Sequence, residues 1–86
     1  MTTERQPAEA FPVHEYILEE MAERKWGAMD LAGVLGRSLE QVAGILDGAK
    51  PLLARDDERL GNAWGTNPAF WLNLQRAYRM WKQAQL

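Results

Sequence analysis

The side chains that most often carry enzyme chemistry are scarce in this sequence. Ser38 is the only serine, His14 is the only histidine, and there is no cysteine. A hydroxyl or thiol nucleophile needs an adjacent base to become reactive, and a single serine and a single histidine offer at most one such pair. Ser38 is better explained as a helix cap, as described below. We therefore expect the protein not to be an enzyme.

Patterns for metals and cofactors are missing as well. His14-Glu15 begins like the two-histidine helix motif of zinc proteases, but Leu18 occupies the position of the second histidine. The acidic groups Glu19-Glu20 and 56–58 are expected to be solvated, and the glycines do not have phosphate-loop spacing. We expect neither a metal nor a cofactor.

The elements that must position any site are helices, because every periodic stretch has helical spacing and none alternates like a strand. The expected helices cover residues 14–25, 28–35, 38–47, 53–64 and 68–83, and residues 1–12 form a flexible tail before a domain at 13–84. In the first helix, one apolar side is assigned to Val13, Ile17, Leu18 and Met21. In the third, the buried stripe is assigned to Leu39, Val42, Ala43, Ile45 and Leu46.

The helix at 53–64 has an interrupted apolar face. Leu53, Leu60 and Trp64 would share one side, but Asp56, Asp57 and Glu58 occupy the turn where another apolar residue is due. The sequence therefore predicts a short helix or one whose first half is exposed.

The stretch 28–47 has the spacing of a helix-turn-helix. Its two helices are joined by only Gly36 and Arg37, and Ser38 and Gln41 form a capping box for the second helix. The positions that must be small or apolar in such a corner carry suitable residues: Ala32, Gly36, Val42 and Ile45. The alternative is a generic corner in an all-α bundle.

The stretch GTNPAFWLNLQRAY, residues 65–78, begins with a stop and a start signal. Gly65 suits the left-handed position after one helix, Thr66 or Asn67 can cap the next, and Pro68 fits its first turn. The helix then carries a wide apolar stripe, part of which we expect to pack inside and part against a second copy. The expected dimer interface consists of Phe70, Trp71, Leu74, Tyr78 and Trp81.

These motifs together resemble the XRE-type helix-turn-helix regulators, and specifically the HigA-type antitoxins. Residues 65–78 are similar to the Gly-Thr-Ser/Asn-Pro-x-Phe-Trp-Leu-Asn-Leu-Gln-x-x-Tyr signature of that group, and ILEEMAERKW, DLAGVLGRS and ILDG match its other blocks in order. The resemblance implies a five-helix lambda-repressor-like domain, a homodimer, operator binding and often neutralisation of a small ribonuclease toxin. Ala28 and Ala49 stand where relatives carry a glutamine and a basic residue, and Asp57 and Glu58 where they carry alanine and leucine.

A recognition helix presents its exposed residues to base edges in the major groove. The residues expected to face DNA are Arg37, Ser38, Glu40, Gln41, Gly44 and Lys50. Arg37 and Lys50 would contact phosphates, Ser38 could donate to a phosphate, and Gln41 could pair with adenine. The carboxylates of Glu40 and Asp47 are unfavourable beside phosphates unless cations offset them. The alternative is therefore a protein-interaction module whose DNA binding has weakened.

Charge is distributed unevenly along the 86 residues. Residues 1–58 carry six basic and twelve acidic side chains, whereas residues 59–86 carry four basic side chains and no acid. Such asymmetry can guide pairing between chains or attract a charged partner, although solvated helix faces would also explain it. The lack of cysteine, of a long apolar run and of a signal peptide in residues 1–12 leads us to expect a cytoplasmic protein with no membrane segment.

Overall fold

The computed structural model describes residues 10–85, and within that range the chain forms five α-helices and no strand, which confirms the all-α prediction. The helices are α1 (Val13–Arg24), α2 (Ala28–Leu35), α3 (Leu39–Leu46), α4 (Ala54–Trp64) and α5 (Phe70–Ala84). Each bound agrees with the expected one to within two residues. Residues 1–9 of the expected tail lie outside the described residues.

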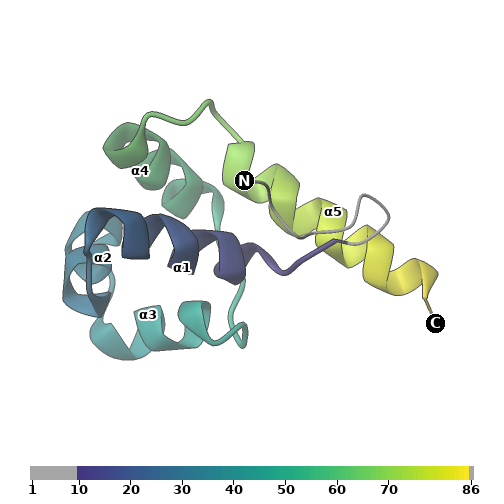
Figure 1. Ribbon diagram of the computed structural model, residues 1–86, viewed down its shortest axis with the longest axis horizontal. Helices are drawn as coiled ribbons and strands as arrows, with labels where there is room; N and C mark the ends of the chain where they lie inside the picture. The colour runs from purple at the N-terminus through teal and green to yellow at the C-terminus, as the bar shows by residue number, and fades with distance from the viewer. Residues whose placement is uncertain (1–9, 86) are drawn as a thin grey trace.

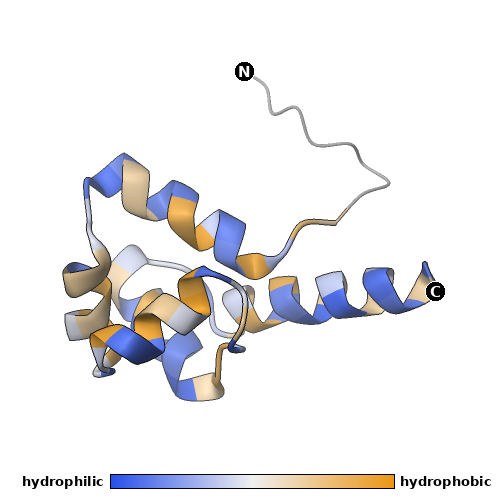
Figure 2. Cartoon of the chain, turned by 90° about the horizontal axis from the view of Figure 1, so that it is seen from below, coloured by the Kyte–Doolittle hydropathy of each residue, from blue (hydrophilic) through white to orange (hydrophobic). Residues whose placement is uncertain are grey.

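The first four helices form a compact group, and α5 extends away from it. α1 packs against α3 and α5, while α2 packs against both α3 and α4. In Figures 1 and 2, which differ by a quarter turn, the C-terminal half of α5 projects beyond the other helices. No helix in residues 10–85 is both long and apolar enough to cross a membrane.

The core draws on every helix. Its buried apolar residues are Val13, Ile17, Met21, Leu31, Leu35, Val42, Ile45, Leu52, Leu60, Trp64 and Trp71. Leu18 was expected in this core but is 43% exposed, because it lies on the side of α1 that faces away from the other helices. The assignment of Leu18 was wrong.

Three of the four tryptophans, Trp26, Trp64 and Trp71, pack together. Trp64 lies between Trp26 and Trp71, with ring centroids 5.3 and 5.5 Å away, and the guanidinium of Arg24 lies 5.1 Å from a Trp64 ring centroid. Trp71 is also edge-on to Phe70 at 4.9 Å. This cluster joins the ends of α1, α4 and α5.

The turn between α2 and α3 has the predicted local chemistry. Gly36 ends α2 in the left-handed conformation, with φ of 67°, and its N–H donates to the carbonyl of Ala32. The left-handed conformation favours glycine, whereas the nearest atom to a β-carbon there, a guanidinium nitrogen of Arg59 at 2.9 Å, is the end of a flexible side chain that can move aside. Ser38 and Gln41 form the expected reciprocal cap at the start of α3, with both distances 3.1 Å.

Two adjacent carboxylates of α4 are buried, contrary to the expectation that they would be solvated. Asp56 is fully buried, and its two oxygens accept hydrogen bonds from Nε and Nη2 of Arg37, both at 2.8 Å. The same carboxylate accepts the N–H of Leu53 at 2.8 Å and so caps its own helix. The hydrogen-bonded guanidinium of Arg37 compensates the cost of burying the Asp56 carboxylate. Sequence spacing alone cannot reveal this pairing, because the two residues lie on different elements.

Asp57 caps α5 from another helix. Its carboxylate accepts the backbone N–H groups of Ala69, Trp71 and Leu72 at 2.7, 2.8 and 3.2 Å. The expectation that Thr66 or Asn67 would cap this helix was wrong. The hydroxyl of Thr66 instead accepts the indole N–H of Trp71 at 3.1 Å.

A glutamine joins α5 to the connection between α3 and α4. The side-chain oxygen of Gln75 accepts the N–H of Leu52 at 2.7 Å, and its nitrogen donates to the carbonyl of Leu52 at 3.1 Å. This two-way bond fixes the connection next to α5.

Replacing Asp57 with alanine should lower the free energy of unfolding by about 3 kcal/mol, because three amides at the start of α5 lose a charged acceptor. Its exposed neighbour provides the matched control, and Glu58→Ala should change stability by no more than about 0.5 kcal/mol. Urea unfolding at one fixed protein concentration, followed by tryptophan fluorescence, measures both. Equal losses for the two variants would contradict the capping role.

Arg37→Gln should destabilise the fold by about 3 kcal/mol, because it leaves the Asp56 carboxylate buried without a counter-ion. The double variant with Asp56→Asn should recover part of that loss, since the buried charge is then also gone. Arg55→Gln, at an exposed position next to Asp56, is the control. Thermal unfolding of the wild type, the single variants Arg37→Gln and Asp56→Asn and the double variant completes the cycle, and additive losses would rule out a stabilising pair.

Candidate nucleic-acid interface

The outer face of α3 is open to solvent. Ser38, Glu40, Gln41 and Ala43 are exposed, while Val42 and Ile45 on the opposite face are buried. The tight turn at Gly36 and the contacts of α1 and α2 with α3 hold this helix in place from behind. The helix-turn-helix corner therefore leaves one whole side of its second helix available for contact.

Leu39 is a residue of this face that the sequence interpretation missed. It was assigned to the buried stripe of its helix, yet it is 51% exposed, and Ala43 one turn later is exposed too. The spacing of Leu39 and Val42 fits a shared face, but only Val42 is covered by the rest of the chain. The sequence did contain one sign that Leu39 could be exposed. Leu39 directly follows the cap residue Ser38 and is therefore the first residue of its helix.

Gln41 remains exposed, but part of its amide is already bonded. Its side-chain oxygen accepts the N–H of Ser38 in the capping box. Bidentate recognition of adenine needs both the oxygen and the nitrogen of an amide, so in this arrangement only the NH₂ group is free to donate. Its role as a base reader stays a prediction.

Arg37 lies at the turn rather than on the open face. Its side chain is 14% exposed, and hydrogen bonding to Asp56 raises the pKa of Arg37 above its ordinary value. The bidentate geometry matches a planar guanidinium to a carboxylate. The predicted phosphate contact would have to use the remaining N–H groups of Arg37.

Lys50 and Gly44, both predicted to face DNA, lie next to each other. A β-carbon on Gly44 would come within 2.8 Å of Cδ of Lys50, so the lysine stem crosses the last turns of α3 at the point where that helix has no side chain. Gly44 therefore makes room for Lys50 and is only partly exposed. The carboxylates of Glu40 and Asp47 are exposed on the same helix and its cap.

The residues expected at a dimer interface are distributed between the core and the surface of α5. Trp71 is 2% exposed, so its ring packs within the protomer and cannot form an outer contact surface. Phe70 is 42% exposed, and Leu74, Tyr78 and Trp81 are half-buried. Tyr78 and Trp81 lie on the half of α5 that projects from the domain, with ring centroids 5.9 Å apart.

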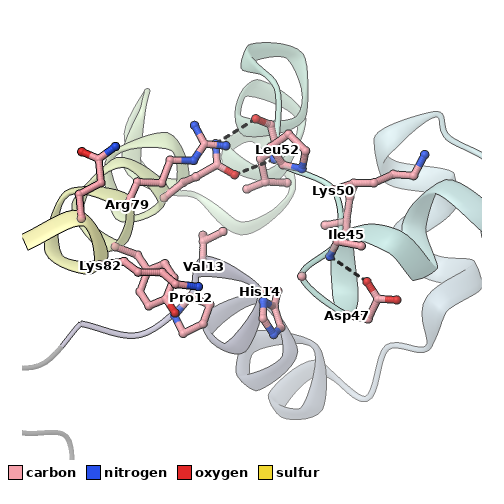
Figure 3. Close-up of a pocket in the computed structure, with 15 residues that line it drawn as sticks. Pro12, Val13, His14, Ile45, Asp47, Lys50, Leu52, Arg79 and Lys82 are labelled. Atoms are coloured by element: carbon pink, nitrogen blue, oxygen red, sulfur yellow. Dashed lines mark hydrogen bonds between the residues drawn. The ribbon is translucent and has the colours of Figure 1, made fainter. Parts of the chain in front are cut away.

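An open cleft of about 610 Å³ begins where α3 ends. It lies between the start of α1, the connection from α3 to α4, and α5. Figure 3 shows Arg79 and Lys82 on one side, Lys50 on the opposite side and His14 between them. The one carboxylate in the lining, Asp47, accepts the N–H of Ala49 at 2.9 Å.

Comparison with solved structures places this fold among antitoxins. An addiction module antidote protein of the HigA family from Coxiella burnetii is 35% identical, with a TM-score of 0.81, and the match covers 90% of this chain and 85% of that one. A protein described as an antidote of a plasmid maintenance system from Nostoc punctiforme is 26% identical, with a TM-score of 0.80 and the same coverage. A hypothetical protein from E. coli shares the fold, with 24% identity and a TM-score of 0.77 over 86% of this chain and 76% of that one.

Neither protein-family models nor curated proteins gave a match to this sequence. The assignment therefore rests on the solved structures, above all on the combination of 35% identity and near-complete coverage of the Coxiella protein. The chain belongs to the HigA family of addiction module antidote proteins.

Proposed function

We propose that this chain is the antitoxin of a HigBA-type toxin–antitoxin system and an XRE-type transcriptional regulator that binds operator DNA as a homodimer. The observation that supports DNA binding best is the open outer face of α3, which begins at a capped end and is held from behind by α1 and α2. A rigid, solvent-facing helix of about 12 Å suits the major groove, which is about 12 Å wide.

The first turn of α3 supplies the proposed base readers. Leu39 presents an apolar surface that fits the methyl group of thymine, and Glu40 can accept a hydrogen bond from the amino group of cytosine. Ser38 and Lys50 would contact phosphates on either side, together with any free N–H groups of Arg37, and the NH₂ group of Gln41 would remain available to a base. The readout is thus expected to depend on the methyl group of a thymine and the amino group of a cytosine.

The proposed dimer surface runs along α5, from its first turn to its projecting half. Phe70, Leu74, Tyr78 and Trp81 offer apolar area that the protomer does not cover completely, and Trp71 supports them from the core. A two-fold dimer should place its two copies of α3 about 34 Å apart, so that each enters a successive major groove on one side of the duplex.

The toxin-related part of the proposal is supported by the family. Two of the similar solved structures are described as antidotes, and an antidote acts against a toxin. We infer that a small ribonuclease toxin is the protein partner of this chain. The exposed carboxylates of Glu40 and Asp47 favour a second candidate, in which α3 contacts a basic protein partner and DNA binding is weak.

A fluorescence-anisotropy titration with the DNA upstream of its own gene tests the DNA-binding role. We expect preference for that DNA over an unrelated duplex, and affinity that falls linearly with the logarithm of salt concentration as counterions are released. Sequence-blind binding, or no binding, combined with co-purification of a small basic toxin, would favour the protein-interaction candidate instead.

The proposed contact between Leu39 and a thymine methyl group can be tested with DNA that lacks that methyl group. Replacing the contacted thymine with deoxyuracil should weaken wild-type binding about fourfold, the effect of one buried methyl group, and should leave the Leu39→Ala variant unaffected. Leu53→Ala removes an equally exposed leucine outside α3 and should keep the sensitivity to deoxyuracil. Every thymine in the preferred site should be replaced in turn. If no replacement weakens binding by the wild type more than binding by Leu39→Ala, Leu39 does not read a thymine methyl group.

A further inference from the structure

The cleft beside the end of α3 carries unpaired positive charge. Arg79, Lys82 and Lys50 line it, and within residues 10–85 no carboxylate forms an ion pair with any of them. Lys82 makes a cation–π contact with Tyr78 at 5.9 Å, which orients the ammonium without neutralising it. Because no acidic residue follows Glu58 in the sequence, α5 itself offers no counter-charge.

Two of these cations are neighbours on α5. Arg79 and Lys82 are three residues apart on one helix, a spacing at which like charges repel. His14 also lies in the cleft, and its ring lies against Gly48, where a β-carbon would come within 2.8 Å of Cε1. The only opposing charge in the lining is Asp47, which already accepts a backbone N–H. An external polyanion would relieve the repulsion.

The position of the cleft shows which polyanion could reach it. Ile45 in the last turn of α3 and the residues from Asp47 to Leu52 belong to its lining. An eight-residue helix is about 12 Å long and the major groove about 12 Å wide, so a helix lying in the groove has both ends near a phosphate strand. A strand that passes the C-terminal end of α3 would meet Lys50 first and then the cations of α5.

We propose that this cleft binds the phosphate backbone of the operator DNA, so that α5 contributes Arg79 and Lys82 to the DNA interface as well as apolar residues to the dimer. The inference rests on the proposed DNA-binding function and extends it to a second, sequence-independent contact outside the helix-turn-helix. It also accounts for an acidic recognition helix on a DNA-binding protein, because the cations of α5 offset the repulsion between its carboxylates and the phosphates.

The salt dependence of DNA binding tests quantitatively whether the cleft contacts phosphates. Each lost phosphate contact should reduce the slope of log K against log salt by about 0.9, so the double variant Arg79→Gln/Lys82→Gln should lose about 1.8. The reduction should be the same for operator and unrelated DNA, because phosphates carry no sequence information. Arg76→Gln is the control, because Arg76 lies on the same helix, is exposed and does not line the cleft.

Each result has a distinct meaning. A slope that falls in the double variant and not in Arg76→Gln supports the cleft. If the wild type prefers its operator while the double variant keeps the full slope, the cleft proposal is overturned and the DNA-binding function stands. If the double variant loses affinity for a protein partner and not for DNA, an acidic protein segment is the occupant, which also overturns the proposal. If the wild type binds no DNA, the proposed function itself fails.

Discussion

Two neighbouring carboxylates on α4 hold this small domain together. Asp56 pairs with Arg37 and caps its own helix, and Asp57 caps the start of α5. One turn of α4 is thereby fastened to the turn of the helix-turn-helix on one side and to the fifth helix on the other. A chain of 86 residues without cysteine has a limited core, so buried, fully bonded charges of this kind supply specific connections that apolar contacts alone would not define.

The functional surface follows from this arrangement. With Arg37 engaged by Asp56, the turn at Gly36 is fixed, and α3 is oriented with Val42 and Ile45 inward and Leu39 and Glu40 outward. With Asp57 bound to its first amides, α5 starts in the core with Trp71, and its C-terminal half projects from the domain (Figure 1). The same two aspartates thus position both the surface proposed to read DNA and the helix proposed to form the dimer.

Local signals in the sequence predicted the helices well, because caps and glycines act within a few residues. Ser38 with Gln41 marked the start of α3, and Gly36 and Gly65 marked the ends of α2 and α4. The sequence could not show that Asp57 caps a helix twelve residues later, or that Asp56 meets Arg37, since both depend on packing between elements. Leu39 was misassigned for the same reason: periodicity tells which residues share a face, not which of them the neighbouring helices cover.

Mapping of amide chemical shifts during a titration with operator DNA tests the central claim most directly. The account predicts that the largest changes fall on Ser38 to Gly44 and on Lys50, with a second group at Arg79 and Lys82, while the core side of α3 stays unchanged. Changes confined to α1, or none at all on α3, would contradict the claim that the outward face of α3 is the one that meets DNA.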